Sequence, residues 1–554
     1  MRGTMMDFPL TLPTILERSG KLFSRVELVS RKPDKTIVRS CYGDFYRRAR
    51  RLAGALTKLG LKSGDRVASM MWNHARHLEA FFGVPCAGGI LHTLNLRLHP
   101  HEIATIAKHA GGRFLLVDDV LLPLYEKFRE DVAFERVIVV PYGFNTVPEG
   151  FLNYDELLNE SSGVEFRYPA IDENDGAAMC FTSGTTGFSK GVIYSHRALV
   201  LHSFCCGLGE VFGMSQLDTV LPVAPMFHAN AWGIPYAATM LGARLVLPGP
   251  HVDPESVLGL MESEHVTIAC GVPTVWIAVL DTLEKNPGKW KFDPPIRVVC
   301  GGTAPPVELM RRLDRFGLQI KHLWGMTETA PIGTSGGLRA HMRDWPEDKK
   351  YETRAKQGWP APFVEIRLMR PEGPEGKSTP EGESREVPCD GTSSGEIEIR
   401  GPWVAGSYYE SPDQAHRWSA DGWFRTGDVA TMDEEGYVKI VDRAKDLVKS
   451  GGEWISSVDL ENALMGHPAV KEACVVGIPH PKWQERPLAA VVLRDGASAT
   501  PEELRAFLGE SFARWQLPDA FVFLEAIPRT SVGKFKKIAL REQFANWKWE
   551  SSGS

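Results

Sequence analysis

Glycines, hydroxyl side chains and one lysine are gathered in residues 181–192, with the sequence FTSGTTGFSKGV. Hydroxyl groups that can donate hydrogen bonds include those of Ser183, Thr185, Thr186 and Ser189. The glycines allow backbone N–H groups to approach an anion closely, and Lys190 adds a positive charge. These residue types and spacings predict a phosphate-binding loop, with a plain turn between two strands as the alternative.

This segment does not match the P-loop of nucleoside triphosphatases, G-x-x-x-x-G-K-[ST]. Counted from Gly184, the position after four spacers is Ser189, and Lys190 is followed by Gly191. The hydroxyl group that would coordinate magnesium beside the lysine is therefore missing. A strand pattern, GVIYSH, also continues until Ser195 can cap a helix, whereas a P-loop opens directly into one. A dinucleotide fingerprint fails as well, for want of G-x-G-x-x-G.

Three later segments have the chemistry to meet a nucleotide. Residues 300–306, CGGTAPP, end a strand pattern with two glycines before a helix start, which is where ligands meet an α/β sheet. Glu328 in WGMTETAP (324–331) offers a hard oxygen ligand, which Mg²⁺ prefers together with phosphate oxygens. Asp428 can accept two hydroxyl donors, as a ribose diol requires. Taken singly, each carboxylate also fits a structural place, a helix cap for Glu328 and a turn for Asp428.

Residues 182–191 resemble the signature [ST]-S-G-[ST]-T-G-x-x-K-G of the acyl-adenylate-forming superfamily, which includes acyl-CoA synthetases, adenylation domains and luciferases. In that family the loop is mobile and embraces the β- and γ-phosphates of ATP. The resemblance implies seven ATP-binding residues: Thr182, Ser183, Gly184, Thr185, Thr186, Gly187 and Lys190. It also implies that Thr185 and Glu328 hold Mg²⁺.

Further collinear motifs extend the resemblance over essentially the whole chain. The residues that it implies as nucleotide contacts are Gly302, Thr303, Ala304, Trp324, Gly325, Met326, Asp428 and Arg443. Trp324 takes the usual tyrosine place beside adenine, and Asp428, at the end of GWFRTGD (422–428), holds the ribose hydroxyls. Thr327 contacts the α-phosphate.

The last motifs are a hinge signature, DRAKDLVKSGGEWIS (442–456), and PRTSVGK (528–534), which fits the family pattern P-x-x-x-x-G-K. Lys445 stands where the family has its hinge residue. The following loop is implied to present its backbone to the pantetheine arm of coenzyme A, through Lys449, Gly451, Gly452, Glu453 and Trp454. Lys534 is implied to be the catalytic lysine, although a lysine near a C-terminus is ordinarily a solvated charge.

The resemblance also implies a two-step reaction. A substrate carboxylate attacks the α-phosphorus of ATP and pyrophosphate leaves, while Lys534, Thr327 and Mg²⁺ bound by Glu328 stabilise the developing charge. The small domain shields the water-sensitive acyl-adenylate. It then rotates about the hinge and withdraws Lys534, so that coenzyme A can attack to give a thioester and AMP.

The acid is indicated by PMFHANAWGIPY (225–236) together with SGGEWISSVDLENALMGHP and PHPKWQERP. These segments resemble the bacterial medium- and long-chain fatty acyl-CoA synthetases. His228, Trp232 and Gly301 are the candidate acyl-site residues, and Trp232 is a candidate gate of the acyl tunnel. Plain packing is the alternative for His228 and Trp232. Ligases for short, sulfonium (dimethylsulfoniopropionate) or aryl acids share these features, so these acids are the alternative substrates.

Strands and helices must position these residues, and the sequence indicates them as short apolar runs that alternate with helical patterns. Buried strands are predicted at 114–117, 137–140, 219–224, 243–247 and 296–300. This alternation predicts an α/β protein whose parallel sheets are covered on both faces. The resemblance adds a large N-terminal domain (1–441) of α/β subdomains plus a distorted β-barrel, a hinge (442–446) and a small mobile α+β C-terminal domain (447–554). Residues 371–395 are predicted to be a solvated loop.

Composition narrows the class of protein. A chain of 554 residues is too long for one core, and a net charge of −6 gives no reason to expect nucleic acid as a partner. Nine cysteines without a C-x-x-C pair indicate reduced thiols. No apolar run reaches about 18 residues, so we expect no transmembrane segment and a cytoplasmic location. The resemblance allows a homodimer.

Three rival classes are weighed against this interpretation. A P-loop ATPase or kinase is disfavoured by the missing G-K-[ST]. A non-enzymatic acyl-binding protein would be expected to lack Lys534 or Glu328, and both are present. An adenylating enzyme that feeds a carrier protein is closer, and differs in its thiol acceptor.

Overall fold

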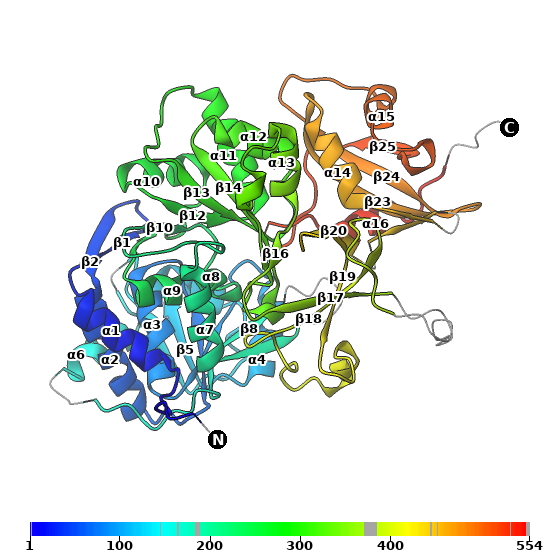
Figure 1. Cartoon of the computed structure of the whole chain (residues 1–554). Coiled ribbons are helices and arrows are strands. Elements are labelled where there is room, and N and C mark those ends of the chain that lie inside the picture. Colours follow the sequence, from blue (N-terminus) through cyan, green and yellow to red (C-terminus); the bar gives the residue numbers. More distant parts are fainter. Residues whose placement is uncertain are drawn as a thin grey trace.

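The computed structural model describes most of the chain (Figure 1). The described residues are 1, 3–144, 146–162, 166–182, 189–370, 385–443, 446–450, 453–531 and 533–549. Following the predicted boundary, we call residues 1–441 the large part and residues 447–554 the small part. In Figure 1 the small part, coloured orange to red, lies beside the green helices of the large part.

One mostly parallel sheet belongs to the first 200 residues. Its described strands, in spatial order, are β7 (Leu152–Asn153), β6 (Arg136–Val140), β5 (Phe114–Asp118), β3 (Arg66–Met70), β4 (Ile90–Thr93), β8 (Gly176–Phe181) and β9 (Gly191–Ser195). The neighbouring pairs are parallel up to β8, and β9 pairs antiparallel with β8. Ser195 ends β9 and caps the next helix, since its hydroxyl accepts a hydrogen bond from the Ala198 N–H at 3.1 Å. The predicted strand after Lys190 is therefore confirmed.

A second sheet is parallel in its centre and antiparallel at its edges. Its described strands, in spatial order, are β16 (Trp359–Pro360), β15 (Thr334–Ser335), β14 (Leu318–Trp324), β13 (Ile296–Cys300), β12 (Ile268–Gly271), β10 (Thr219–Pro222), β11 (Arg244–Leu247), β1 (Glu27–Arg31) and β2 (Ile37–Cys41). All five strands predicted from apolar runs are present in these two sheets.

The helices of the large part form three layers around the two sheets. The layer between the sheets contains α1 (Leu12–Leu22), α2 (Tyr42–Lys58), α3 (Ala75–Cys86), α7 (His196–Gly207) and α9 (Ile234–Leu241). Outside the first sheet lie α4 (Pro100–Ala110) and α5 (Leu122–Tyr125). Outside the second sheet lie α10 (Pro254–Ser263), α11 (Pro273–Lys285) and α12 (Val307–Asp314). The remaining helical pieces are α6 (Tyr154–Glu160), α8 (Ala229–Trp232), α13 (Glu347–Ala355), η1 (Asp119–Leu121), η2 (Thr327–Thr329), η3 (Ala340–Met342) and η4 (Pro412–Arg417).

Burial on both faces explains why the strands read as continuous apolar runs. In β5, Phe114 and Leu116 pack into the layer between the sheets, whereas Leu115 and Val117 pack against α4 and α5. Successive strand residues point to opposite faces, so a sheet covered twice needs apolar residues at every position. The predicted fold class is confirmed on this evidence.

The region predicted as a distorted β-barrel is an antiparallel sheet in the described residues. Its strands are β17 (Glu365–Met369), β18 (Ser394–Arg400), β19 (Phe424–Met432) and β20 (Val438–Arg443). Because β18 begins at Ser394, the predicted solvated loop 371–395 ends two residues too late; residues 371–384 lie outside the described part. Asp442 and Arg443, predicted as the start of the hinge, are the last residues of β20.

The small part is an α+β unit, as predicted. Its described strands are β22 (Glu453–Ile455), β21 (Val448–Ser450), β24 (Gln484–Leu493), β23 (Val470–His480) and β25 (Ala520–Phe523). Helices α14 (Ser457–Gly466) and α15 (Pro501–Gly509) cover one face, α16 (Lys537–Gln543) covers the other, and η5 is Arg514–Gln516. The domain boundary and the mobility of the small part stay predictions.

Two expectations about the whole chain can be compared with the described structure. All nine cysteines are free, as expected for reduced thiols. Among the described residues, no helix is both long and apolar enough to span a membrane.

Candidate active site

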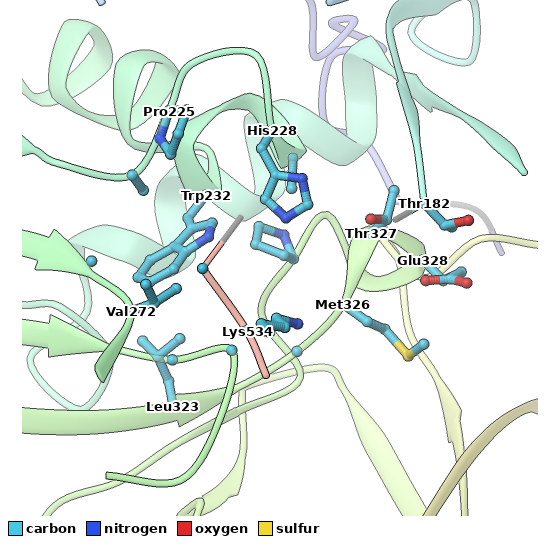
Figure 2. Close-up of a pocket in the computed structure, with 18 of the residues that line it drawn as sticks. Thr182, Pro225, His228, Trp232, Val272, Leu323, Met326, Thr327, Glu328 and Lys534 are labelled. Atoms are coloured by element: carbon cyan, nitrogen blue, oxygen red, sulfur yellow. The ribbon is translucent and has the colours of Figure 1, made fainter. Parts of the chain in front are cut away.

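A cavity of about 430 Å³ lies at the carboxyl ends of strands β10, β12, β13 and β14 (Figure 2). Residues that directly follow these strands line it: Val223 and Ala224 after β10, Val272 after β12, and Gly301 and Gly302 after β13. In an open α/β sheet this edge is where ligands bind.

The two ends of this cavity differ in chemistry. The polar end is lined by Thr182, Lys190, Thr327, Glu328, Tyr408 and Arg443. The apolar end is lined by Val223, Pro225, Trp232, Val252, Val272, Val275 and Leu323. Figure 2 shows His228 and Lys534 between the two ends.

Lys534 enters the cavity from the small part. It lies close to Gly302, where an added Cβ would be 3.2 Å from the lysine Cε and where φ is +94°. Both the space and the backbone conformation therefore favour glycine at this position. Burial, and to a smaller extent the positive charge of the nearby Arg443 guanidinium, lowers the pKa of Lys534 to about 8. Near neutral pH the ammonium is charged, and it lacks much of its water.

The polar end is organised by two tyrosines. The Tyr408 hydroxyl donates a hydrogen bond to Glu328 Oε1 at 2.5 Å, and the Tyr194 hydroxyl donates to the Thr327 carbonyl at 2.7 Å. Burial and the Glu328 carboxylate raise the pKa of Tyr408 well above its ordinary value, so its hydroxyl stays a donor. The Lys190 Nζ lies 5.2 Å from the centre of the Tyr408 ring. These contacts fix one carboxylate oxygen of Glu328, and no hydrogen bond from the described residues engages the other.

A second cavity of about 470 Å³ continues from Gly302 and Lys534 toward the small part. Asp428 lies in its wall, where one carboxylate oxygen accepts a hydrogen bond from Trp324 Nε1 at 2.8 Å and the other forms an ion pair with Arg443 Nε at 2.9 Å. A carboxylate has about four lone-pair positions, so Asp428 can still accept two hydroxyl groups. The predicted ribose contact is therefore chemically compatible with this arrangement.

The apolar end contains an unusual backbone segment. Ala229, Asn230, Ala231 and Trp232 all have positive φ, between 42° and 60°, and Gly233 follows at 71°. A left-handed conformation costs non-glycine residues roughly 1–2 kcal/mol each, so it persists only where the surroundings enforce it. The turn directs Trp232 into the cavity beside Val272 (Figure 2).

His228 lies where the apolar and polar ends meet. Burial, together with the charges of Lys534 and Arg97, lowers the pKa of His228 to about 3. The imidazole is therefore neutral at ordinary pH and can act there as a hydrogen-bonding group rather than as a cation.

The structure brings most of the predicted site residues together. The first cavity contains Thr182, Lys190, His228, Trp232, Gly301, Gly302, Gly325, Met326, Thr327, Glu328, Arg443 and Lys534. The second adds Thr303, Ala304, Trp324 and Asp428. An added Cβ at Gly301 would lie 2.9 Å from Leu323 Cδ1, which explains glycine at the cavity wall.

The remaining predicted residues are either away from the cavities or outside the described part of the chain. Lys449 lies on β21, where its backbone N–H donates to Glu485 Oε2 at 3.0 Å, and it lines neither of the cavities described. The backbones of Glu453 and Trp454 form β22. Outside the described residues lie Ser183, Gly184, Thr185, Thr186, Gly187, Lys445, Gly451 and Gly452.

Several cavity residues were not found from the sequence, among them three with long polar side chains: Arg97, Tyr408 and Arg417. Tyr408 reaches Glu328 across 80 positions in the chain, and no local pattern indicates that contact. Arg97 follows β4 in a segment that reads as an ordinary loop. Their place in the site follows from the folded arrangement alone.

Comparison with known proteins agrees with this geometry. Residues 26–409 match the family model of the AMP-binding enzyme, and residues 459–534 match the AMP-binding enzyme C-terminal domain. A long-chain-fatty-acid–CoA ligase of Thermus thermophilus is 50% identical over 98% of this chain and 97% of its own length. A medium-chain-fatty-acid–CoA ligase of Ectopseudomonas oleovorans is 40% identical over 100% of both chains. A 3-methylmercaptopropionyl-CoA ligase of Ruegeria lacuscaerulensis is also 40% identical, over 98% of this chain and 99% of its own length.

Solved structures share the same fold. The anthranilate CoA ligase AuaEII in complex with anthranoyl-AMP has a TM-score of 0.85 at 24% identity and covers 98% of this chain and 99% of its own. ATP-bound MatB from Rhodopseudomonas palustris has a TM-score of 0.80 at 25% identity, and it covers 97% of this chain and 99% of its own. The resemblance inferred from the motifs and the prediction of an acid–thiol ligase are confirmed, and the chain belongs to the AMP-binding enzyme family.

Proposed function

We propose that the chain is an ATP-dependent acyl-CoA synthetase for a medium- or long-chain fatty acid, with Lys534 as its catalytic lysine. The supporting observation is the place of Lys534, in one cavity with Thr327 and Glu328 on its polar side and Trp232 on its apolar side. A buried ammonium between a polar and an apolar surface suits the point where a carboxylate meets a phosphate.

In the first half-reaction a carboxylate oxygen of the acid attacks the α-phosphorus of ATP, and pyrophosphate leaves in line. Lys534 stabilises the charge that develops on the phosphoryl oxygens, and the Thr327 hydroxyl donates to the α-phosphate. Asp428 and Trp324 hold the nucleoside in the second cavity. The buried site limits access of water to the acyl-adenylate.

Glu328 is the residue that would hold Mg²⁺. Its carboxylate lines the cavity, and one oxygen is oriented by Tyr408. Among the described residues, no group of three His, Cys, Asp or Glu forms a ready-made metal site. This donor set fits Mg²⁺, which typically takes one or two carboxylates and completes its shell with phosphate oxygens and water. Mg²⁺ bound there would neutralise phosphate charge. Thr185, the second proposed ligand, lies outside the described residues.

In the second half-reaction the small part turns about Lys445 and removes Lys534 from the cavity. Coenzyme A then enters, its thiolate attacks the acyl carbonyl, and AMP leaves. The proposed coenzyme A contacts, Lys449 and residues 451–454, would approach the cavity after that rotation. No protein nucleophile takes part in either step.

The apolar end supports a fatty acid, and Trp232 determines how long it can be. The 430 Å³ of the first cavity must also hold phosphates, so the indole as placed leaves room for a short acyl chain. A long chain requires Trp232 to move, which is the proposed gating role. A short, sulfonium or aryl acid is the second candidate, because it fits the cavity with the indole in place.

The test is ATP-dependent consumption of coenzyme A across straight-chain acids of increasing length, with aryl and sulfonium acids alongside. We expect consumption to peak with medium or long chains and to yield AMP and pyrophosphate. A peak with short, aryl or sulfonium acids would support the second candidate. Orthophosphate release would indicate a hydrolase, and adenylate formation without thioester would indicate a carrier protein as acceptor.

Two further features belong to the same proposal. Free cysteines throughout the chain support a reducing compartment, and we propose the cytoplasm. A homodimer is proposed from the resemblance to long-chain enzymes, and sedimentation of the purified protein tests it.

A further inference from the structure

The turn that carries Lys534 is closed by its own hydrogen bonds. The Thr530 N–H donates to the Lys534 carbonyl at 2.7 Å, and the Lys534 N–H donates to Thr530 Oγ1 at 3.1 Å. Arg529 donates to the Gly533 carbonyl at 3.2 Å and pairs with Glu472 of β23 at 2.6 Å. Because both sides of the turn are tied together, a contact that holds its tip also holds Lys534.

Ser531, in the described part of this turn, hydrogen-bonds to the large part. Asn95 Nδ2 donates a hydrogen bond to Ser531 Oγ at 2.9 Å, and Arg97 Nη1 donates to the Ser531 carbonyl at 3.4 Å. Asn95 and Arg97 lie between β4 and α4, 436 and 434 positions away from Ser531. Asn95 is itself oriented, since its Oδ1 accepts a hydrogen bond from the Arg97 N–H at 3.1 Å.

We propose that Asn95 is a positioning residue for adenylate formation: its amide holds the Ser531 turn so that Lys534 stays in the cavity. This inference rests on the proposed function. Arg97 lines the first cavity and could also meet a ligand, whereas Asn95 lines neither of the cavities described. A change at Asn95 therefore acts through the turn.

The contact joins the two parts of the chain, so it exists only while Lys534 occupies the cavity. Removing it lowers the population of that arrangement and leaves the arrangement required for coenzyme A unaffected. One hydrogen bond between neutral groups contributes a modest amount, so each single substitution should slow adenylate formation about fivefold.

The test measures both half-reactions in the full-length protein. Asn95→Ala, Ser531→Ala and the double variant are assayed for ATP–pyrophosphate exchange and for thioester formation from supplied acyl-adenylate. We expect each single variant to lose exchange, the double variant to lose no more than either, and thioester formation to stay at or above the unsubstituted rate. Asn95→Asp should restore exchange, since its carboxylate can accept the Ser531 hydroxyl and still accept the Arg97 N–H.

Lys285→Ala is the matched control. Lys285 pairs with Asp495 at 2.9 Å and also joins the large and small parts, but away from the turn. We expect this exposed pair to affect exchange little. Equal losses in both half-reactions, additive losses in the double variant, or unchanged exchange in Asn95→Ala would each overturn the inference. An unsubstituted protein that forms no adenylate would instead overturn the proposed function itself.

Discussion

The cavity between the polar and the apolar end is entered by a residue of the small part, whereas the apolar end takes its groups from the large part alone. Lys534 comes from the small part and lines the same cavity as Thr327 and Glu328. Trp232, Pro225 and Val272 all come from segments that follow strands of one sheet. The chemical step therefore depends on how the two parts are arranged, and the choice of acid does not.

Removing the lysine should have the largest effect. Lys534→Ala should lower adenylate formation about 10³-fold, because Lys190, the other lysine that lines the described cavity, lies at its polar end and not between the two ends. Thioester formation from supplied acyl-adenylate should change less than about threefold. Lys471→Ala, at a lysine of the small part that lines neither of the cavities described, serves as the control. Equal loss of both half-reactions would contradict the proposal that Lys534 acts in adenylate formation and is withdrawn before thioester formation.

Shortening the tryptophan should alter the choice of acid. Trp232→Ala enlarges the apolar end, and the ratio of kcat/KM for a twelve-carbon acid over a four-carbon acid should rise about 20-fold. Trp483→Ala, at a partly exposed tryptophan of the small part, should leave that ratio unchanged. An unchanged ratio in Trp232→Ala would mean that the indole only packs against its neighbours and does not select the length of the acid.

Loss of one tyrosine hydroxyl should weaken the polar end. Tyr408→Phe removes the 2.5 Å hydrogen bond to Glu328. Bonds to a charged group contribute more than neutral ones, so we expect about a tenfold rise in the Mg²⁺ concentration needed for half-maximal adenylate formation. Tyr409→Phe is the neighbouring control, since this ring lies near His109. The idea that Tyr408 orients the carboxylate fails if the two variants behave alike.

The smallest predicted effect is a dependence on pH. The pKa of Lys534 is lowered to about 8, so its positive charge is lost as pH rises through that value. The kcat/KM for ATP in adenylate formation should fall about fourfold between roughly pH 7 and pH 8.5. Lys534→Arg keeps its charge over this range and should give a flat profile at a lower rate. A profile that falls equally in both proteins would assign the dependence to another group.

The strands and the main site residues could be predicted because their signals are local. Apolar runs buried on both faces indicate β5 and its neighbours, and the motifs around Lys190, Glu328 and Lys534 stand in the sequence. Their convergence followed from the family resemblance. What could not be predicted are contacts between distant segments, such as Asn95 with Ser531 and Trp324 with Asp428.

The left-handed turn at Ala229–Gly233 was also beyond prediction. Alanine and tryptophan disfavour positive φ, and only Asn230 and Gly233 tolerate it well. Packing around the turn decides its shape, and packing has no local signature. The same holds for the room available to an acyl chain, which depends on where Trp232 is directed.

The most direct test of attack at the α-phosphorus uses an acid labelled with ¹⁸O in its carboxylate. The purified protein is supplied with this acid, ATP and coenzyme A, and the phosphate-containing products are analysed by mass spectrometry. We predict one ¹⁸O atom in each AMP, because the attacking carboxylate oxygen leaves with AMP when the thioester forms. Label in orthophosphate, or AMP without label, would contradict the account.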